Sequence, residues 1–143
     1  MGITAKQAAQ RLILAHWGQW QSIEELMVDI TEDQIDPLWD KHCDDLQDSR
    51  SEVRWQGDEV SEIKTRAHYS WERNYDVDVR VIKLPGDRGL AYNFMSGGGK
   101  HGEPDAYPWW EEAWFVEVTG TVTTVRHTYA DIPELEDAEE PAQ

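Results

Sequence analysis

The stretch "DVDVRVIKLPGDRGLAYNF", residues 76–94, decides the fold class of this 143-residue chain. From Val77 to Val81, valine alternates with polar residues, which is the period of a half-buried strand. Residues 85–89, "PGDRG", are typical of a tight turn, and apolar residues recur at every second position from Leu90. The stretch therefore predicts two antiparallel strands joined by a turn.

The same period of two appears on both sides of this hairpin. It predicts further strands at residues 51–55, 63–71, 110–118 and 121–129. Since strands that follow one another along the chain tend to be neighbours in a sheet, we expect a meander.

The N-terminal third follows the helical period instead. "TAKQ" is a capping box that starts a helix at Thr4, and Gly18 is a plausible end. A second capping box at residues 22–25 predicts a short helix. Asp36 is a good cap for a third helix, because Pro37 then takes the first helical position, where its missing N–H costs nothing.

Together these patterns predict an α+β fold. We expect two or three N-terminal helices packed on a curved, mainly antiparallel sheet of five or six strands. Residues 1–130 would form a single domain, and residues 131–143 an acidic C-terminal tail.

The net charge of −16 is divided unevenly along the chain. Residues 1–60 carry −8, residues 61–130 carry −2 and residues 131–143 carry −6. Binding to nucleic acid is disfavoured, because it requires clustered lysine and arginine. A negative surface favours a basic protein partner, although it also serves solubility alone.

Other features of the composition concern location. The one cysteine, Cys43, forms no intrachain disulfide, which fits a reducing compartment. No apolar run approaches the length of a membrane span, and the N-terminus does not resemble a signal peptide. We expect a cytoplasmic protein, or a virion-associated one if a phage encodes it, with no membrane partner.

Residues 96–110, "SGGGKHGEPDAYPWW", raise the question of a site in a loop. A phosphate-binding loop is excluded, because His101 stands where Ser or Thr must follow Lys100. His101, Glu103 and Asp105 could face an ion, but no second histidine or cysteine lies at ligand spacing, so we expect no metal and no cofactor. Long loops are often functional, and we predict a binding loop or flap. Its partner-binding residues would be Lys100, His101, Asp105 and an exposed Trp109.

Four aspartates of the third expected helix lie outside its apolar stripe: Asp40, Asp44, Asp45 and Asp48. The last three would sit near the helix C-terminus, where the helix dipole disfavours anions. Their acidity therefore hints at a role in binding a partner.

Catalytic patterns are scarce. No GxSxG is present, and Cys43 stands among aspartates whose negative charge opposes a reactive thiolate. His68 and His127 lie on expected strands and could meet across the sheet, which is more often a structural pair. The sequence favours a protein that is not an enzyme.

Two segments carry a family resemblance. "RLILAHWGQWQSIEELMVDITED", residues 11–33, and "EEAWFVEVTGTVTTVRHTYAD", residues 111–131, resemble the cone-shaped ketosteroid-isomerase-like superfamily over about a third of the chain. The resemblance implies a curved sheet wrapped against helices and a small-molecule pocket. It implies no particular reaction.

Two functions follow as hypotheses. The first is a non-catalytic acidic interaction protein that binds a basic protein surface, such as an inhibitor, an immunity-type protein or a virion or assembly component. The alternative is a cone-fold pocket protein that binds or converts a small apolar ligand. The sequence also leaves open whether the chain forms a homo-oligomer and whether it is a domain without specific partners.

Overall fold

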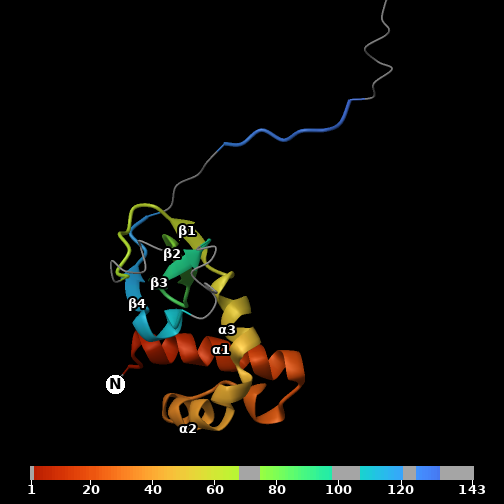
Figure 1. Ribbon diagram of the computed structural model, residues 1–143, viewed down its shortest axis with the longest axis vertical. Coiled ribbons are helices and arrows are strands. Elements are labelled where there is room, and N and C mark those ends of the chain that lie inside the picture. The colour runs from red at the N-terminus through yellow and green to blue at the C-terminus, as the bar shows by residue number, and fades with distance from the viewer. Residues whose placement is uncertain (1, 68–74, 98–106, 121–124, 133–143) are drawn as a thin grey trace, which may run out of the picture.

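A computed structural model of the chain describes residues 2–67, 75–97, 107–120 and 125–132 (Figure 1). In chain order the described elements are α1 (Ala5–Gln21), the 3-10 helix η1 (Glu24–Leu26), α2 (Glu32–His42), the 3-10 helix η2 (Cys43–Asp45), α3 (Gln47–Arg54), β1 (Asp58–Val60), β2 (Asp76–Lys83), β3 (Arg88–Ser96), the 3-10 helix η5 (Trp109–Glu112) and β4 (Trp114–Glu117). The α-helices precede the strands, so the predicted α+β class is confirmed.

The hairpin predicted from residues 76–94 is confirmed. All eight residues of β2 pair antiparallel with β3. The Leu84 N–H donates to the Arg88 carbonyl oxygen at 3.0 Å, and Gly86 turns the chain with a left-handed φ of 80°. The alternating valines and the glycine-containing turn thus form the predicted hairpin.

The sheet is open and antiparallel, with strand order β1-β2-β3-β4. We expected five or six strands, and the described residues form four. The strand predicted at residues 110–118 is present in part: β4 begins at Trp114, because Trp110 belongs to η5 instead.

The strand predicted at residues 51–55 is wrong, because α3 extends to Arg54. Ser49 and Val53, one helical turn apart, are buried, whereas Trp55 is 55 % exposed. A short alternation of apolar and polar residues fits a strand or a helix. Here Ser49 and Val53, four residues apart, both face the interior, as they do in a helix.

The long strand predicted at residues 63–71 is also not found where the structure describes it. Residues 61–67 hold no strand, and residues 68–71, with His68, lie outside the described residues. The short strand β1 occupies the edge beside β2 instead.

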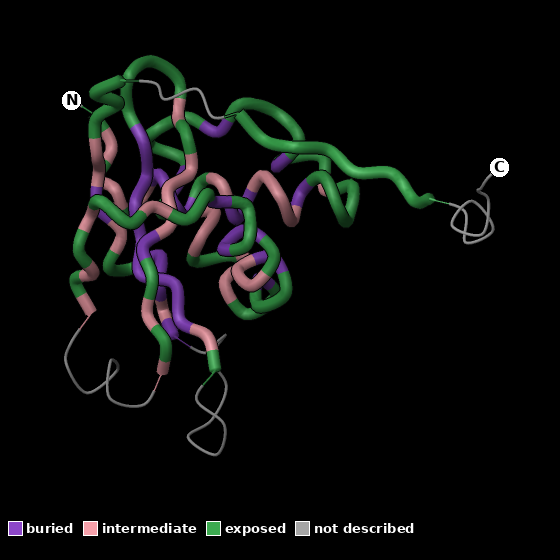
Figure 2. Tube along the Cα trace, turned by 90° about the horizontal axis from the view of Figure 1, so that it is seen from above, coloured by how far each residue is buried: buried purple, intermediate pink, exposed green. Residues whose placement is uncertain are grey.

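The strand predicted at residues 121–129 fails over its described part. Residues 125–132 are exposed, contain no strand and extend away from the helices and the sheet (Figures 1 and 2). Val125 and Tyr129 are each 90 % exposed. Residues with high β-propensity form a strand only where a neighbouring strand pairs with them.

Helix α1 starts as predicted but ends later. The Gln7 N–H donates to Thr4 Oγ1 at 3.1 Å, and the Thr4 N–H donates to Gln7 Oε1 at 3.0 Å. The helix runs past Gly18 to Gln21. A Cβ atom at Gly18 would lie 2.4 Å from the Leu26 Cβ, so this glycine permits close packing of η1 rather than ending the helix.

Two other predicted helix starts are wrong. Ser22 ends α1 with a left-handed φ of 56° instead of capping the predicted short helix, which is present as the 3-10 helix η1 and begins at Glu24. Helix α2 begins after Thr31, whose N–H donates to Gln34 Oε1 at 3.0 Å. This capping interaction starts the helix before Asp36, and Pro37 lies inside it.

Helix α1 lies between α2 and the sheet (Figure 1). It contributes to a core that also includes β3 and η5, and the buried stretches in Figure 2 mark this interior. Large, fully buried members of the core are Ile13, Leu14, Leu90, Tyr92 and Trp109. A smaller buried cluster of Val79, Ala91 and Trp114 lies on the other face of the sheet.

Candidate protein-binding surface

Residues 24–48 form what we call the acidic layer. This segment holds ten carboxylates, one lysine and no arginine, a net charge of −9 out of −16 for the chain. All ten acidic residues are exposed: Glu24, Glu25, Asp29, Glu32, Asp33, Asp36, Asp40, Asp44, Asp45 and Asp48. More than half of the net charge thus belongs to one short segment.

Helix α2 presents its acids on one face. At 3.6 residues per turn, Glu32, Asp33, Asp36 and Asp40 fall within about 100° of arc. Ile35 is completely buried, and Leu38 and Trp39 are partly buried against the main core. Because this apolar side packs inward and α2 lies on the side of α1 away from the sheet, the acids point outward (Figure 1).

Three predicted site residues have a different helical setting from the one expected. Asp44 and Asp45 lie in η2, and Asp48 lies in the first turn of α3, because α2 ends at His42. Asp44 and Asp45 directly follow the C-terminal end of α2, as predicted, but the prediction of a helix C-terminus is wrong for Asp48. The positive end of a helix dipole favours an anion such as Asp48.

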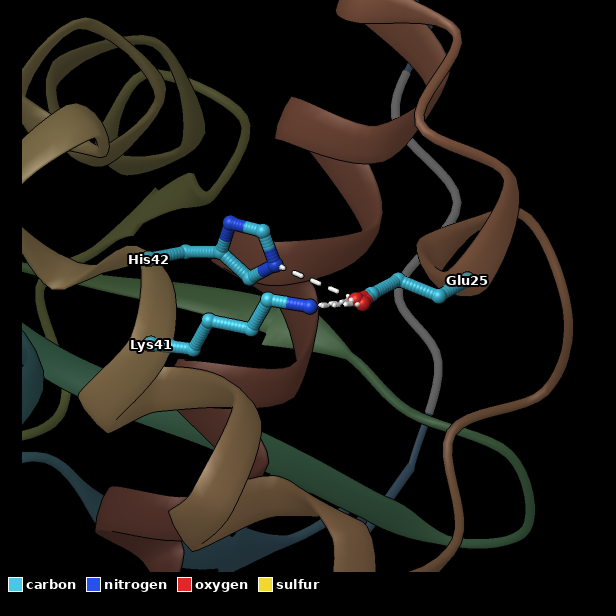
Figure 3. Close-up of polar contacts among 3 residues, drawn as sticks. All are labelled: Glu25, Lys41 and His42. Atoms are coloured by element: carbon cyan, nitrogen blue, oxygen red, sulfur yellow. Dashed lines mark hydrogen bonds and ion pairs between the residues drawn. The ribbon is translucent and has the colours of Figure 1, made fainter.

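One carboxylate of the acidic layer is neutralised by neighbours (Figure 3). Lys41 Nζ lies 2.6 Å from Glu25 Oε1, and His42 Nε2 lies 3.7 Å from the same atom. The hydrogen bond from Lys41 lowers the pKa of Glu25 below its ordinary value. Among the described residues, the other nine carboxylates of the layer have no ion pair.

Arginine side chains outside the layer contact aromatic rings. Their guanidinium carbons lie over ring centroids in five residues: Arg50 over Trp110 at 4.8 Å, Arg54 and Arg80 over Phe94 at 4.3 and 3.9 Å, Arg66 over Trp114 at 4.4 Å and Arg88 over Phe115 at 4.6 Å. These distances are in the range of cation–π contacts. These five guanidinium groups thus contact rings, whereas Arg11 contacts the layer by donating to the Ile30 carbonyl oxygen at 3.5 Å.

The loop predicted as a binding element, residues 96–110, lies only partly within the described residues. Lys100, His101 and Asp105 lie outside the described residues. Trp109, expected to be exposed, is 1 % exposed, so that prediction is wrong. Its indole Nε1 donates to the Arg50 carbonyl oxygen at 3.0 Å, and its ring lies 4.6 Å from that of Tyr92. The 3-10 turn of η5 directs the ring into the core.

A buried polar network was not foreseen from the sequence. Asn93 Nδ2 donates to the Tyr107 hydroxyl at 3.0 Å, and Asn93 Oδ1 accepts from the Arg66 N–H at 2.8 Å. The Tyr107 hydroxyl donates to Glu112, and burial together with this bond raises the pKa of Tyr107. The polar Asn93 inside an apolar strand was the available signal. The network joins three segments and has a structural role.

The alternative hypothesis requires a deep apolar cavity between helices and sheet. Among the described residues, Leu14, Tyr92 and Trp109 fill that space. A cavity of about 620 Å³ opens between α1, α2 and η5 and has a largely polar lining that includes Lys6 and Asp40. A second cavity, of about 520 Å³, has a more apolar lining and is formed by the N-terminal part of α1, the β2–β3 turn and β4. The apolar-ligand hypothesis therefore stays a prediction.

Other functional constellations are also missing from the described part of the chain. It contains no group of three or more histidine, cysteine or acidic side chains placed to hold a metal ion. His127, predicted to meet His68 across the sheet, is exposed on the extended segment. His68 lies outside the described residues. The described helices include none that is long and apolar enough to cross a membrane.

Comparisons with protein-family models, with curated proteins and with solved structures gave no match to this chain. The resemblance to the ketosteroid-isomerase-like superfamily therefore stays a prediction, and the case for function depends on the surface described above.

Proposed function

We propose that the chain is a non-catalytic interaction protein whose acidic layer binds a basic surface of a protein partner. One observation carries this proposal: ten exposed carboxylates lie in 25 consecutive residues, and one of them has an ion pair within the described structure. An inhibitor, an immunity-type protein and a virion or assembly component would each use such a surface.

The physical basis is electrostatic complementarity. Concentrated charge of one sign raises the association rate with an oppositely charged partner and suppresses wrong partners. Helix α2 supports this role, because its buried Ile35 holds the outward carboxylates on a fixed backbone. Little ordering is then required on binding, which favours affinity.

The first experiment captures partners from a lysate of the organism that encodes the chain, at about 0.1 M and about 1 M salt, where screening lengths are about 10 and 3 Å. We expect a basic protein to be retained at low salt and released at high salt. Absence of a partner at both salt concentrations would contradict the proposal.

A matched pair of variants then locates the surface on the captured partner after its purification. The first replaces Asp40, Asp44, Asp45 and Asp48 by asparagine. The second removes the same charge from exposed positions of the sheet side, as Asp76→Asn, Asp78→Asn, Asp87→Asn and Glu117→Gln. We expect about tenfold weaker binding for the first variant and a smaller loss for the second. Equal losses would show that the layer is not the binding surface.

A further inference from the structure

A second feature of the surface lies where the C-terminal half of α1 meets α3. A surface cavity of about 540 Å³ is lined by His16, Gln19 and Trp20 of α1 and by Glu52 of α3. Trp20 is 53 % exposed, and Glu52 is exposed without an ion pair in the described structure. The cavity thus combines an accessible aromatic side chain with a free carboxylate.

The fold holds this tryptophan in place from behind. Its ring lies 6.0 Å from that of His16 and 6.2 Å from that of Trp17, both in edge-to-face geometry. His16 Nδ1 is 2.8 Å from Ser49 Oγ, which fastens α1 to α3 at the cavity. Such support reduces the ordering cost of a contact with Trp20.

A second exposed tryptophan of the chain provides a comparison. Trp55 has almost the same exposure, 55 %, but the guanidinium carbons of Arg54 and Arg80 each lie 5.2 Å from its ring centroid. No described cation lies over Trp20. The charged group that lines its cavity is Glu52, which has the sign to attract a cation.

We propose that this cavity accepts an arginine side chain of the basic partner, with the guanidinium over Trp20 and paired with Glu52. The inference rests on the proposed function and adds its anchor residue. A guanidinium fits better than an ammonium, because its planar group stacks on a ring while its N–H groups reach a carboxylate.

The test uses the full chain and a small probe, Nα-acetyl-L-arginine amide, with the neutral citrulline amide as matched control. Tryptophan indole N–H signals are followed by NMR during titration. We expect a saturable shift of the Trp20 signal with the arginine probe. Citrulline amide should produce little shift.

Four variants make the result specific. Glu52→Gln removes the ion pair and should weaken binding of the probe by up to about five-fold, the range of an exposed ion pair. Trp20→Leu removes the ring and should abolish the saturable response, which is then followed on the backbone signals of Gln19 and Glu52. Trp55→Leu and Glu59→Gln are the controls and should retain it, because each changes an exposed residue of the same type away from the cavity.

A shift that does not saturate, that citrulline reproduces, or that Glu52→Gln leaves unchanged would overturn the inference. If the probe fails while the acidic-layer variant still weakens the partner, the anchor alone is wrong. If the probe binds but no basic partner exists, the proposed function fails and the cation site stands.

Discussion

Two regions of this molecule treat charge in opposite ways. Five arginines, of α3, the sheet and the segment between β1 and β2, lie against aromatic rings that belong to or border the two buried clusters. In the acidic layer, ten carboxylates face outward, and one, Glu25, is paired. These five guanidinium groups thus contact the packed structure, although Arg66 and Arg88 are exposed, whereas the carboxylates of the layer lie on its surface.

This difference implies that stability and binding reside in separate parts of the chain. Stacked guanidinium groups and buried aromatic side chains add to the free energy of unfolding. Exposed like charges add nothing to it and repel each other weakly. Substitutions in the first region should therefore lower the free energy of unfolding, and substitutions in the second should change the affinity for a partner.

The largest effect is expected where the first region meets the core, at Trp109. Trp109→Ala removes a ring packed against Tyr92 and the donor to the Arg50 carbonyl oxygen, and should lower the free energy of unfolding by about 3–5 kcal/mol. Urea unfolding gives the value. Trp20→Ala, at an exposed position, is the control and should cost less than about 1 kcal/mol. Similar losses for both would contradict the burial of Trp109.

A smaller effect in the same region depends on pH. Burial raises the pKa of Tyr92 to about 12, from 10.0, and its hydroxyl donates to the Arg54 carbonyl oxygen at 2.6 Å. Because the folded state holds the proton more tightly, this stabilisation is complete below about pH 10 and is lost as the pH rises toward about 12.

Tyr92→Phe serves as the reference for this titration. The difference in unfolding free energy between wild type and Tyr92→Phe should shrink by about 1 kcal/mol between about pH 10 and about pH 11. Urea unfolding at these pH values measures it. A difference that stays constant over this range would show that Tyr92 does not have the raised pKa.

The part of the fold that the sequence predicts best is the hairpin of β2 and β3, because its alternation and its turn are both local. The N-terminal cap of α1 is predicted for the same reason. The end of α1 is not predicted, because Gly18 is required for close contact with Leu26. This contact is tertiary, and local sequence rules do not describe it.

The site residues also divide into those whose position local sequence predicts and those whose position depends on tertiary packing. The exposure of Asp40, Asp44, Asp45 and Asp48 follows from their place outside an apolar stripe. The burial of Trp109 does not follow from alternation, because η5 replaces the expected strand there and turns the ring inward. The Trp20–Glu52 cavity joins residues of two helices, and sequence spacing does not show how helices pack.

The acidic layer provides the opposite test, with an effect near zero. The variant with asparagine at positions 40, 44, 45 and 48 should change the free energy of unfolding by at most about 0.5 kcal/mol, with a gain where repulsion is relieved. Urea unfolding at about 0.1 M and about 1 M salt measures it, since salt screens any such repulsion. A large loss of stability would mean that these carboxylates have structural partners, and the contrast between the two regions would fail.

Glu25 is the place where the acidic layer resembles the other region, and we expect the smallest stability effect there. Lys41 lowers its pKa, so the stabilisation is present above the ordinary value of 4.5 and is lost as the pH falls through the lower folded value. NMR titration should find the pKa of Glu25 nearer 4.5 in Lys41→Met than in wild type. Lys6→Met is the matched control, because it removes the same charge from an exposed lysine that has no ion pair with Glu25, and it should leave the pKa of Glu25 almost as in wild type. Equal changes in both variants would indicate a general effect of net charge rather than the direct bond, because that bond comes from Lys41.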